Sequence, residues 1–143
     1  MLRIEKSVLI DRPVQVVWDF VGDLKNSPDW TRSGSELRQT SEGPVGVGTT
    51  IESRRRLFGR DVKSQSLRVV GYEPIREVVF EGSVPLLGHP NMRLSFEPSG
   101  GGTRLTRMAE LDLAGPLRIL QPLLARVFES EMASIKRLIE ADA

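Results

Sequence analysis

Three charged residues, Arg55, Arg107 and Glu131, lie in segments whose alternation or helical period predicts a buried face. A bare carboxylate in an apolar interior is costly, so it has to be paired, hydrated or protonated. Such a group can orient a polar part of a ligand, or accept and return a proton during a reaction. We therefore treat these three residues as candidates for polar chemistry inside the molecule.

Glu131 is the sharpest of these candidates. A helical projection of residues 117–141 places it near the centre of an apolar stripe. In that position it is expected to meet Arg107, Arg55 or a polar group of a ligand. The alternative is that Pro122 rotates the helix, or that the second half of the helix protrudes, so that Glu131 faces water.

The orientation of the two arginines depends on strand register. Apolar residues alternate along residues 103–112, and the register that points them at the helix carries Arg107 with them. The residues then left in solvent are Thr106, Met108 and Glu110. The opposite register would expose three apolar residues, so the first is favoured. Arg55 faces inward if Ile51 and Leu57 do, whereas a β-bulge would turn it outward.

Other motifs are better explained by structure than by chemistry. His89 is the single histidine and stands between Gly88 and Pro90, so we interpret it as a turn residue, with a lone general base as the alternative. The glycine-rich segment 43–48 lacks the Lys-Ser/Thr of a phosphate-binding loop and leads into a strand. No cluster has the spacing of a metal site, and no cofactor is expected. The arginine run 54–56 fits a solvated, edge-protecting outer face as a whole, whereas strand alternation leaves only Arg54 and Arg56 there when Arg55 faces inward.

The composition limits the classes of protein to consider. The 143 residues suit a single domain covering residues 1–143, and the formal net charge is only +1. That charge does not favour a nucleic-acid partner, and no apolar stretch is long enough for stable insertion into a membrane. The chain has no cysteine, and its N-terminus lacks the apolar run of a signal peptide. We therefore expect a cytoplasmic protein.

Hydrophobic periodicity predicts one strand and two short helices at the N-terminal end. The strand covers residues 2–10, and Asp11 is a candidate N-cap for a helix over residues 13–22. A second short turn is expected to run to about Asn26 and to be stopped by Pro28.

The rest of the chain predicts six strands followed by a long helix at 117–141, kinked or restarted at Pro122. The strands are expected at residues 35–41, 48–57, 61–72, 76–84, 91–98 and 103–112. The apolar stripe of the helix consists of Leu117, Leu120, Leu124, Val127, Phe128, Ile135 and Leu138, flanked by Leu123, Met132 and Ile139.

These elements predict an α+β fold with one antiparallel seven-stranded sheet. Seven strands about 4.8 Å apart make a sheet roughly 29 Å wide, whereas one helix is only about 10 Å across. The sheet is therefore expected to curl around the C-terminal helix. A space still remains between its concave face and the helix, and five Phe, two Trp and one Tyr are few to fill it.

Four sequence stretches carry a resemblance to a known superfamily. They are "VLIDRPVQVVWDFVGDLKNSPDW", "PVGVGT", "GYEPIREVVF" and "FEPSGGGTRLT", in this order and before a long helix. This pattern resembles the START/Bet v 1-like (SRPBCC) superfamily over nearly the whole chain, and is most similar to its bacterial polyketide cyclase/dehydrase-like branch. The resemblance implies a helix-grip fold with a hydrophobic cavity between the curved sheet and the last helix. Members bind lipids, hormones or polyketides, and a few are cyclases or aromatases.

The first functional hypothesis is therefore a non-catalytic carrier or sensor of a hydrophobic small molecule of lipid, isoprenoid or polyketide type, as a monomer or homodimer. The alternative is a polyketide cyclase or aromatase that uses polar groups of the cavity, so catalysis is left open. A protein-interaction module is disfavoured because the predicted outer face is charged. Trp18 is expected to pack beneath the sheet and Trp30 near the cavity mouth, although both fit ordinary core aromatics. The predicted ligand-binding residues are Trp30, Arg55, Phe80, Met92, Leu94, Phe96, Arg107, Phe128, Glu131 and Met132.

Overall fold

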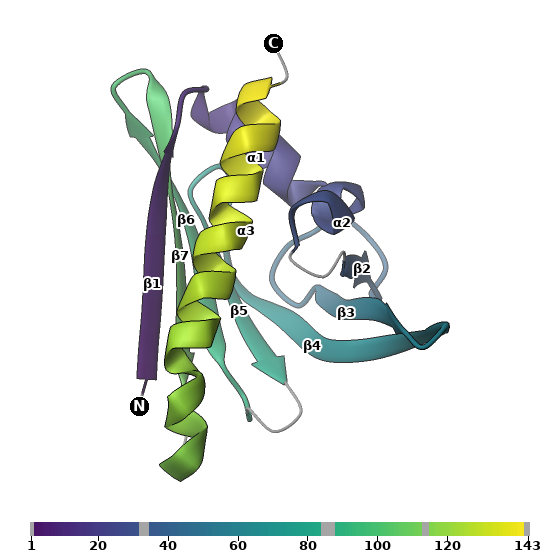
Figure 1. Cartoon of the computed structure of the whole chain (residues 1–143). Coiled ribbons are helices and arrows are strands. Elements are labelled where there is room, and N and C mark those ends of the chain that lie inside the picture. The colour runs from purple at the N-terminus through teal and green to yellow at the C-terminus, as the bar shows by residue number, and fades with distance from the viewer. Residues whose placement is uncertain (1, 32–34, 84–87, 113–114, 142–143) are drawn as a thin grey trace.

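A curved antiparallel sheet of seven strands wraps beside one long helix (Figure 1). The structure is a computed structural model that describes residues 2–31, 35–83, 88–112 and 115–141; the side chains of residues 55–57, 64, 115 and 117 are not described. The strands follow the order β1-β7-β6-β5-β4-β3-β2, so every neighbour except the β1–β7 pair is consecutive in sequence. The predicted α+β fold and the predicted strand number are confirmed.

The bounds of the elements lie close to those that periodicity predicts. The strands are β1 Leu2–Ile10, β2 Glu36–Gln39, β3 Thr50–Leu57, β4 Arg60–Glu73, β5 Glu77–Ser83, β6 Asn91–Ser99 and β7 Gly102–Leu111. The helices are α1 Val14–Gly22, η1 Leu24–Asn26, α2 Ser27–Trp30, η2 Gly115–Leu120 and α3 Gln121–Ala141, where η denotes a 3₁₀ helix. None of the described helices is long and apolar enough to cross a lipid bilayer.

Three prolines mark helix starts, which corrects two expectations and confirms a third. Pro13, not Asp11, is the N-cap of α1, and no side chain caps that end. Pro28 does not stop a helix but lies in the first turn of α2, where its missing N–H costs nothing. Pro122 occupies the equivalent place in α3, after the 3₁₀ turn η2, so the predicted restart at Pro122 is confirmed.

Helix α3 buries a narrower face than the predicted stripe. Its buried residues are Phe128, Glu131, Met132, Ile135 and Ile139. Leu123, expected at the flank of the stripe, is half exposed, and the side chain of Leu117 lies outside the described part. Met132 and Ile139, also placed at the flank, are almost fully buried, so the face that packs is rotated from the predicted one.

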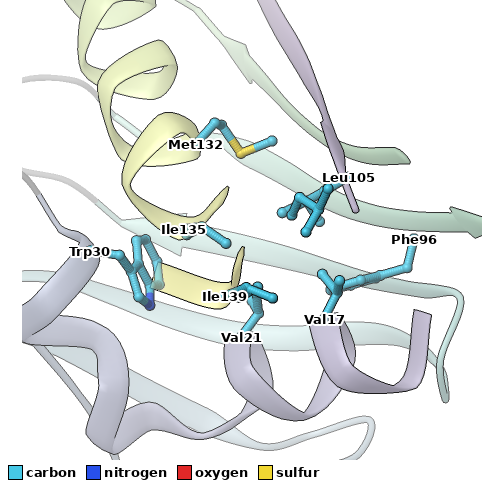
Figure 2. Packing of buried hydrophobic residues seen from close by; sticks show 9 residues of the cluster. Val17, Val21, Trp30, Phe96, Leu105, Met132, Ile135 and Ile139 are labelled. Carbon is cyan, nitrogen blue, oxygen red and sulfur yellow. The ribbon is translucent and has the colours of Figure 1, made fainter. Parts of the chain in front are cut away.

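Buried apolar side chains form three groups, and α3 contributes to two of them. One joins α3 to α1, α2 and the sheet through Val17, Trp30, Phe96, Leu105 and Ile135, among others (Figure 2). The second packs Phe128 against Ile4, Ala109 and Leu111 of β1 and β7. The third covers β3, β4 and β5 through Ile51, Leu67, Val69 and Val78, and no residue of α3 belongs to it. The helix therefore covers the β1–β7 side of the sheet, while β3–β5 pack against other partners.

The alternation along β1 and β7 is regular, but two residues differ from expectation. Met108, expected in solvent, is buried on the convex face, where its cross-strand neighbours are Glu5 and Arg93. Long charged side chains commonly shield an apolar neighbour with their aliphatic stems. Lys6 shares the concave face with Ile4 rather than the polar one, and its amine reaches Glu129 of α3 at 3.9 Å.

Hydrogen bonds fasten the last turns of α3 to the junction between β1 and α1. The Asp11 backbone N–H donates to Glu140 Oε2 at 2.8 Å, and the Arg12 guanidinium donates to the Glu140 backbone carbonyl at 2.6 Å. Lys136 Nζ donates to the Leu9 carbonyl and to Glu140 Oε2, both at 2.6 Å. We call this set the junction clamp. It holds the end of α3 at the β1 edge of the sheet.

Gly102 begins β7 beside the junction clamp, and substitution there tests the close approach of two strands. A Cβ at position 102 would lie 2.5 Å from the Ile10 carbonyl oxygen, and backbone cannot yield like a flexible side chain. We expect Gly102→Ala to lower the free energy of unfolding by about 1–3 kcal/mol, measured by urea denaturation. Gly46→Ala is the control, because nothing lies within 4 Å of a Cβ there. Equal stability of the two variants would contradict this packing.

The junction clamp also predicts an acid-sensitive contribution to stability. Hydrogen bonds from Lys136, and then from the Asp11 backbone N–H, lower the pKa of Glu140 below its ordinary value. The stabilisation is therefore complete above the pKa of the unfolded chain and is lost as pH falls through the lower pKa of the folded state.

We expect Glu140→Gln to lower the Tm at neutral pH, and the Tm difference from the wild type to shrink toward about pH 3. Thermal melts across that range measure it. Glu129→Gln is the control, because Glu129 is an exposed residue of the same helix with only a 3.9 Å contact to Lys6. A Tm difference for Glu140→Gln that is constant with pH would rule out the linkage.

Candidate functional site

An ion pair between β7 and α3 lies on the concave side of the sheet. Arg107 Nη1 donates to Glu131 Oε1 at 2.5 Å, and the two side chains are only 20% and 10% exposed. Both residues were predicted to point inward, and both orientations are confirmed. Regular alternation along β7 places Arg107 between buried Leu105 and Ala109, and the period of α3 places Glu131 beside Met132.

The guanidinium of Arg107 is also held by an aromatic face. Its Cζ atom lies 4.0 Å from the ring centroid of Phe128, one turn before Glu131 on α3. A cation at this distance is attracted by the quadrupole of the ring. Among the described residues, Glu131 is the only side chain that accepts a hydrogen bond from Arg107. Since a guanidinium carries five N–H donors, several are left for a further acceptor.

A contribution to folding stability is a poor explanation for the presence of this ion pair. Removing two charges from water costs several kcal/mol, and apolar side chains of similar volume are often as stabilising. In chemical terms, the site offers a cation that can hold a carbonyl or enolate oxygen and a carboxylate that can accept a proton. Both groups come from rigid elements, a central strand and a long helix, so their positions are fixed before any ligand arrives.

The concave face of the central strands is incompletely covered. Phe80, Met92 and Leu94 point to the same side as α3, as predicted, yet each is only half-buried. Residues at the middle of a filled core are normally its most buried ones. Leu94 is also the cross-strand neighbour of Arg107, so the partly open area adjoins the ion pair.

The other predicted apolar contacts lie in the packed part of the core. Phe96, Phe128 and Met132 are all buried, at 3%, 8% and 2% exposure. Their inward orientation is as predicted, whereas their role toward a ligand stays a prediction. Phe128 and Met132 belong to α3, whereas Phe96 of β6 packs against Trp18.

A β-bulge brings Tyr72 to the concave side, and sequence reasoning did not include this residue. The register of β4 against β5 shifts between Val69 and Gly71, so that Val69 and Tyr72 share one face. The Tyr72 ring then lies 5.7 Å from Trp18, whose indole meets Phe96 edge-on at 5.0 Å. A glycine inside a long strand is the sequence signal that could have indicated the bulge. The expected packing of Trp18 beneath the sheet is confirmed.

Trp30 is buried beside α3 and carries an unusual polar atom. Figure 2 shows its indole next to Ile135 and Ile139, and only 8% of the residue is exposed. Its Nε1 is buried and has no hydrogen-bond partner in the described structure. A buried donor without an acceptor costs about 1–3 kcal/mol, so such an atom calls for an explanation.

Two further sequence candidates do not join the site as described. The side chain of Arg55 lies outside the described part, so its predicted direction stays a prediction. Ser53 is buried, but the register of β3 against β4 shifts between Ser53 and Arg54, at the place where a bulge was the stated alternative. His89 is exposed in the connection between β5 and β6. Among the described residues, no group of three His, Cys, Asp or Glu side chains could hold a metal ion.

A separate groove of about 520 Å³ crosses the convex face of β3, β4 and β5. Its lining side chains are mostly polar, and they include Lys63 and the ion pair between Arg68 and Glu81, 3.4 Å apart. Charges of both signs at an open surface do not suit an apolar molecule. This groove is therefore distinct from the concave site.

Comparison with known proteins agrees with this geometry. A family model described as polyketide cyclase / dehydrase and lipid transport matches residues 1–140. No curated protein sequence matches the chain significantly.

Solved structures with the same fold cover almost the whole chain. TTHA0849 from Thermus thermophilus is 16% identical, with a TM-score of 0.75 and 99% of both chains covered. The crystal structure of Ara h 8.0201 is 13% identical, with the same TM-score and coverage. The Zhui aromatase/cyclase from Streptomyces sp. R1128 is 15% identical, with a TM-score of 0.73 and coverage of 97% of this chain and 93% of that one. These structures confirm the predicted helix-grip fold.

The ion pair predicts a strong coupling that a surface pair lacks. We expect Glu131→Gln or Arg107→Gln alone to lower the free energy of unfolding by about 3 kcal/mol, because each removes one half of a largely buried ion pair. The double variant should lose clearly less than the sum of the two losses. Arg93 and Glu77, an exposed pair 2.8 Å apart, provide the control cycle, with an expected coupling below about 1 kcal/mol. Similar coupling in both cycles would contradict the burial of Arg107 and Glu131.

Proposed function

The chain belongs to the polyketide cyclase/dehydrase and lipid transport family, and from this premise we propose that it binds a hydrophobic small molecule, of lipid, isoprenoid or polyketide type, between the sheet and α3. The observation that carries the proposal is the partial burial of Phe80, Met92 and Leu94 on the concave face. A ligand lying over β5 and β6 would remove these side chains from water.

Apolar contact supplies most of the affinity in this proposal. Burying apolar surface contributes roughly 25 cal/mol per Å², so a few hundred Å² of ligand and protein surface gives several kcal/mol. The thioether of Met92 can adapt to ligands of different shape. Phe96, Phe128 and Met132, buried in the adjoining core, form a firm wall against which the ligand lies.

Polar groups at the edge of the apolar area fix the orientation of the ligand. The free donors of Arg107, beside Glu131, suit a carboxylate, carbonyl or enol oxygen. The Nε1 atom of Trp30 suits a second acceptor, which would relieve its lack of a partner. A long apolar body with oxygen at one end fits both features, and lipids, isoprenoid acids and polyketides all have it.

A second candidate function is cyclisation or aromatisation of a polyketide-like chain. It is favoured by one observation, the contact of a carboxylate with a guanidinium in a largely apolar setting. Glu131 would take a proton from a carbon next to a carbonyl, while Arg107 stabilises the enolate oxygen. The enolate carbon would attack a second carbonyl of the same chain, and the resulting alkoxide would regain the proton from Glu131. Arg55 is the third candidate for this chemistry.

The compartment and assembly state belong to the same proposal. A chain without cysteine needs no oxidising environment, which fits the cytoplasm. A monomer or a homodimer suits the site equally, because the residues that form it come from a single chain.

Filling the concave space tests the proposal most directly. We expect Leu94→Trp to weaken binding of a pyrene-labelled fatty acid at least about tenfold, because the indole would occupy the ligand's place. Its free energy of unfolding should change by less than about 1 kcal/mol, since the space is open. Fluorescence titration and urea denaturation provide the two measurements.

Leu105→Trp is the matched control, because Leu105 faces the same side from β7 but is fully buried. It should lose about 1–3 kcal/mol or more through overpacking. Equal destabilisation of the two variants would show a solid interior and end the proposal.

Native mass spectrometry of the purified protein separates the two functions: a retained lipid or isoprenoid favours the carrier. Turnover of a poly-β-keto substrate by a protein purified empty favours the enzyme.

A further inference from the structure

Phe58 lies at the tip of the β3–β4 hairpin and is completely exposed. Leu57 pairs with Arg60, so Phe58 and Gly59 form a two-residue turn, and both have positive φ, at 52° and 76°. This is a type I′ turn, in which Asn, Asp and Gly are the preferred residues. A phenylalanine in the left-handed conformation is strained, and here it gains no burial in return. The fold of this chain gives no reason for an aromatic residue at the tip.

The hairpin extends beyond the sheet as a two-stranded arm, residues 55–65. Strand β2 pairs with β3 only as far as Arg54, and β5 pairs with β4 only from Ser66 onward. Between those limits no strand of the described residues pairs with β3 or β4 from outside, and Figure 1 shows their hairpin projecting away from α3. The tip is therefore accessible to a flat surface approaching the molecule.

The positive charge of the protein is concentrated at this arm and at Arg54, which directly precedes it. Residues 54–63 contain five arginines or lysines and one aspartate, a net charge of +4, while the whole chain carries +1. The rest of the chain therefore carries −3. Arg54 is neutralised locally by Glu52 and Asp61, at 2.8 and 3.1 Å. Arg60 and Lys63 are exposed and form no ion pair with any described residue.

An exposed apolar tip with flanking cations matches the chemistry of an anionic bilayer surface. Apolar side chains enter the boundary between headgroups and acyl chains, while Lys and Arg remain at the level of the phosphates. A nucleic acid would also attract the charge, but Phe58 is the only aromatic residue of the arm, whereas single strands are bound on rows of stacking platforms. Val62, also exposed, adds to the apolar character of the arm.

We propose that the β3–β4 arm docks the protein reversibly on anionic phospholipid membranes, with Phe58 inserted into the interface and Arg60 and Lys63 facing the phosphates. One aromatic side chain and a few cations give weak, peripheral binding rather than permanent anchoring. The docking surface is separate from the concave site, so this inference does not rest on the proposed ligand.

Co-sedimentation of the purified chain with vesicles tests the docking. The wild type is expected to bind phosphatidylcholine vesicles that contain phosphatidylglycerol, to bind pure phosphatidylcholine poorly, and to dissociate as salt is raised. Phe58→Asn should weaken binding roughly tenfold, because the inserted apolar surface is lost. Its Tm should be unchanged or higher, since Asn suits the type I′ turn. A loss of binding therefore cannot be attributed to unfolding.

Control variants separate the arm from the general properties of the surface. Val47→Asn removes an apolar side chain that is 71% exposed in another loop, and Ile119→Asn one that is 82% exposed beside α3. Both should bind vesicles as the wild type does. The double variant Arg60→Gln/Lys63→Gln should lose most binding, whereas Lys25→Gln/Arg104→Gln, with the same change in net charge, should keep it.

Several outcomes would overturn the proposal. They are no binding of the wild type to anionic vesicles, equal binding of Phe58→Asn, or equal losses in both double variants. Binding of single-stranded DNA that is as tight as vesicle binding and unaffected by Phe58→Asn would assign the arm to nucleic acid instead. In each case the fatty-acid titration is unaffected, so the failure of docking is distinguishable from a failure of ligand binding.

Discussion

The structure depends on a mismatch of widths between its sheet and its one long helix. Seven strands about 4.8 Å apart extend far beyond the roughly 10 Å that a helix covers. The helix α3 lies along the β1–β7 side, where it shares two groups of buried residues with the sheet. The β3–β5 side of the sheet therefore packs against residues outside α3. Trp18, Leu24 and Leu37, from the short helices and β2, provide this packing at one end of β3–β5. The middle of the concave face is left half-buried.

Hydrogen bonds at one end of α3 add to the buried side chains that hold it against the sheet. The junction clamp joins Lys136 and Glu140 to main-chain atoms of Leu9 and Asp11 and to the guanidinium of Arg12, which lie at the junction between β1 and α1. Because the helix is anchored there, the centre of the concave face does not have to be packed solid to hold it. The Arg107–Glu131 contact then lies beside half-buried Leu94, at the border of the packed side. A polar pair is less costly where its surroundings are only partly buried than in a closed core.

Periodicity alone predicts most of this fold because every strand and helix has one clearly apolar face. The order of elements, the restart at Pro122 and the inward positions of Arg107 and Glu131 all follow from alternation or from the helical period. Sequence reasoning fails where one residue breaks the period. The bulge at Val69–Gly71 turns Tyr72 inward, and the phase of a strand beyond a bulge cannot be counted from its start. Pairing is equally hidden, because Glu131 had three possible partners and only the packing of α3 against β7 brings Arg107 to it.

The two halves of the sheet can therefore carry different tasks. Strands β1, β7 and β6 share their buried residues with α3 and hold the polar pair at a fixed place. Among the described side chains, those of β3 and β4 share no buried group with α3, and the register shifts at Ser53–Arg54 and Val69–Gly71 let the two strands bend and extend as an arm. Because β-bulges increase local twist, the arm can leave the curve of the sheet without disturbing the register of β6 and β7. Charge follows the same division, with the basic excess on the arm and an acidic remainder. Substitutions at the arm can thus alter which surface the arm binds without altering the concave site.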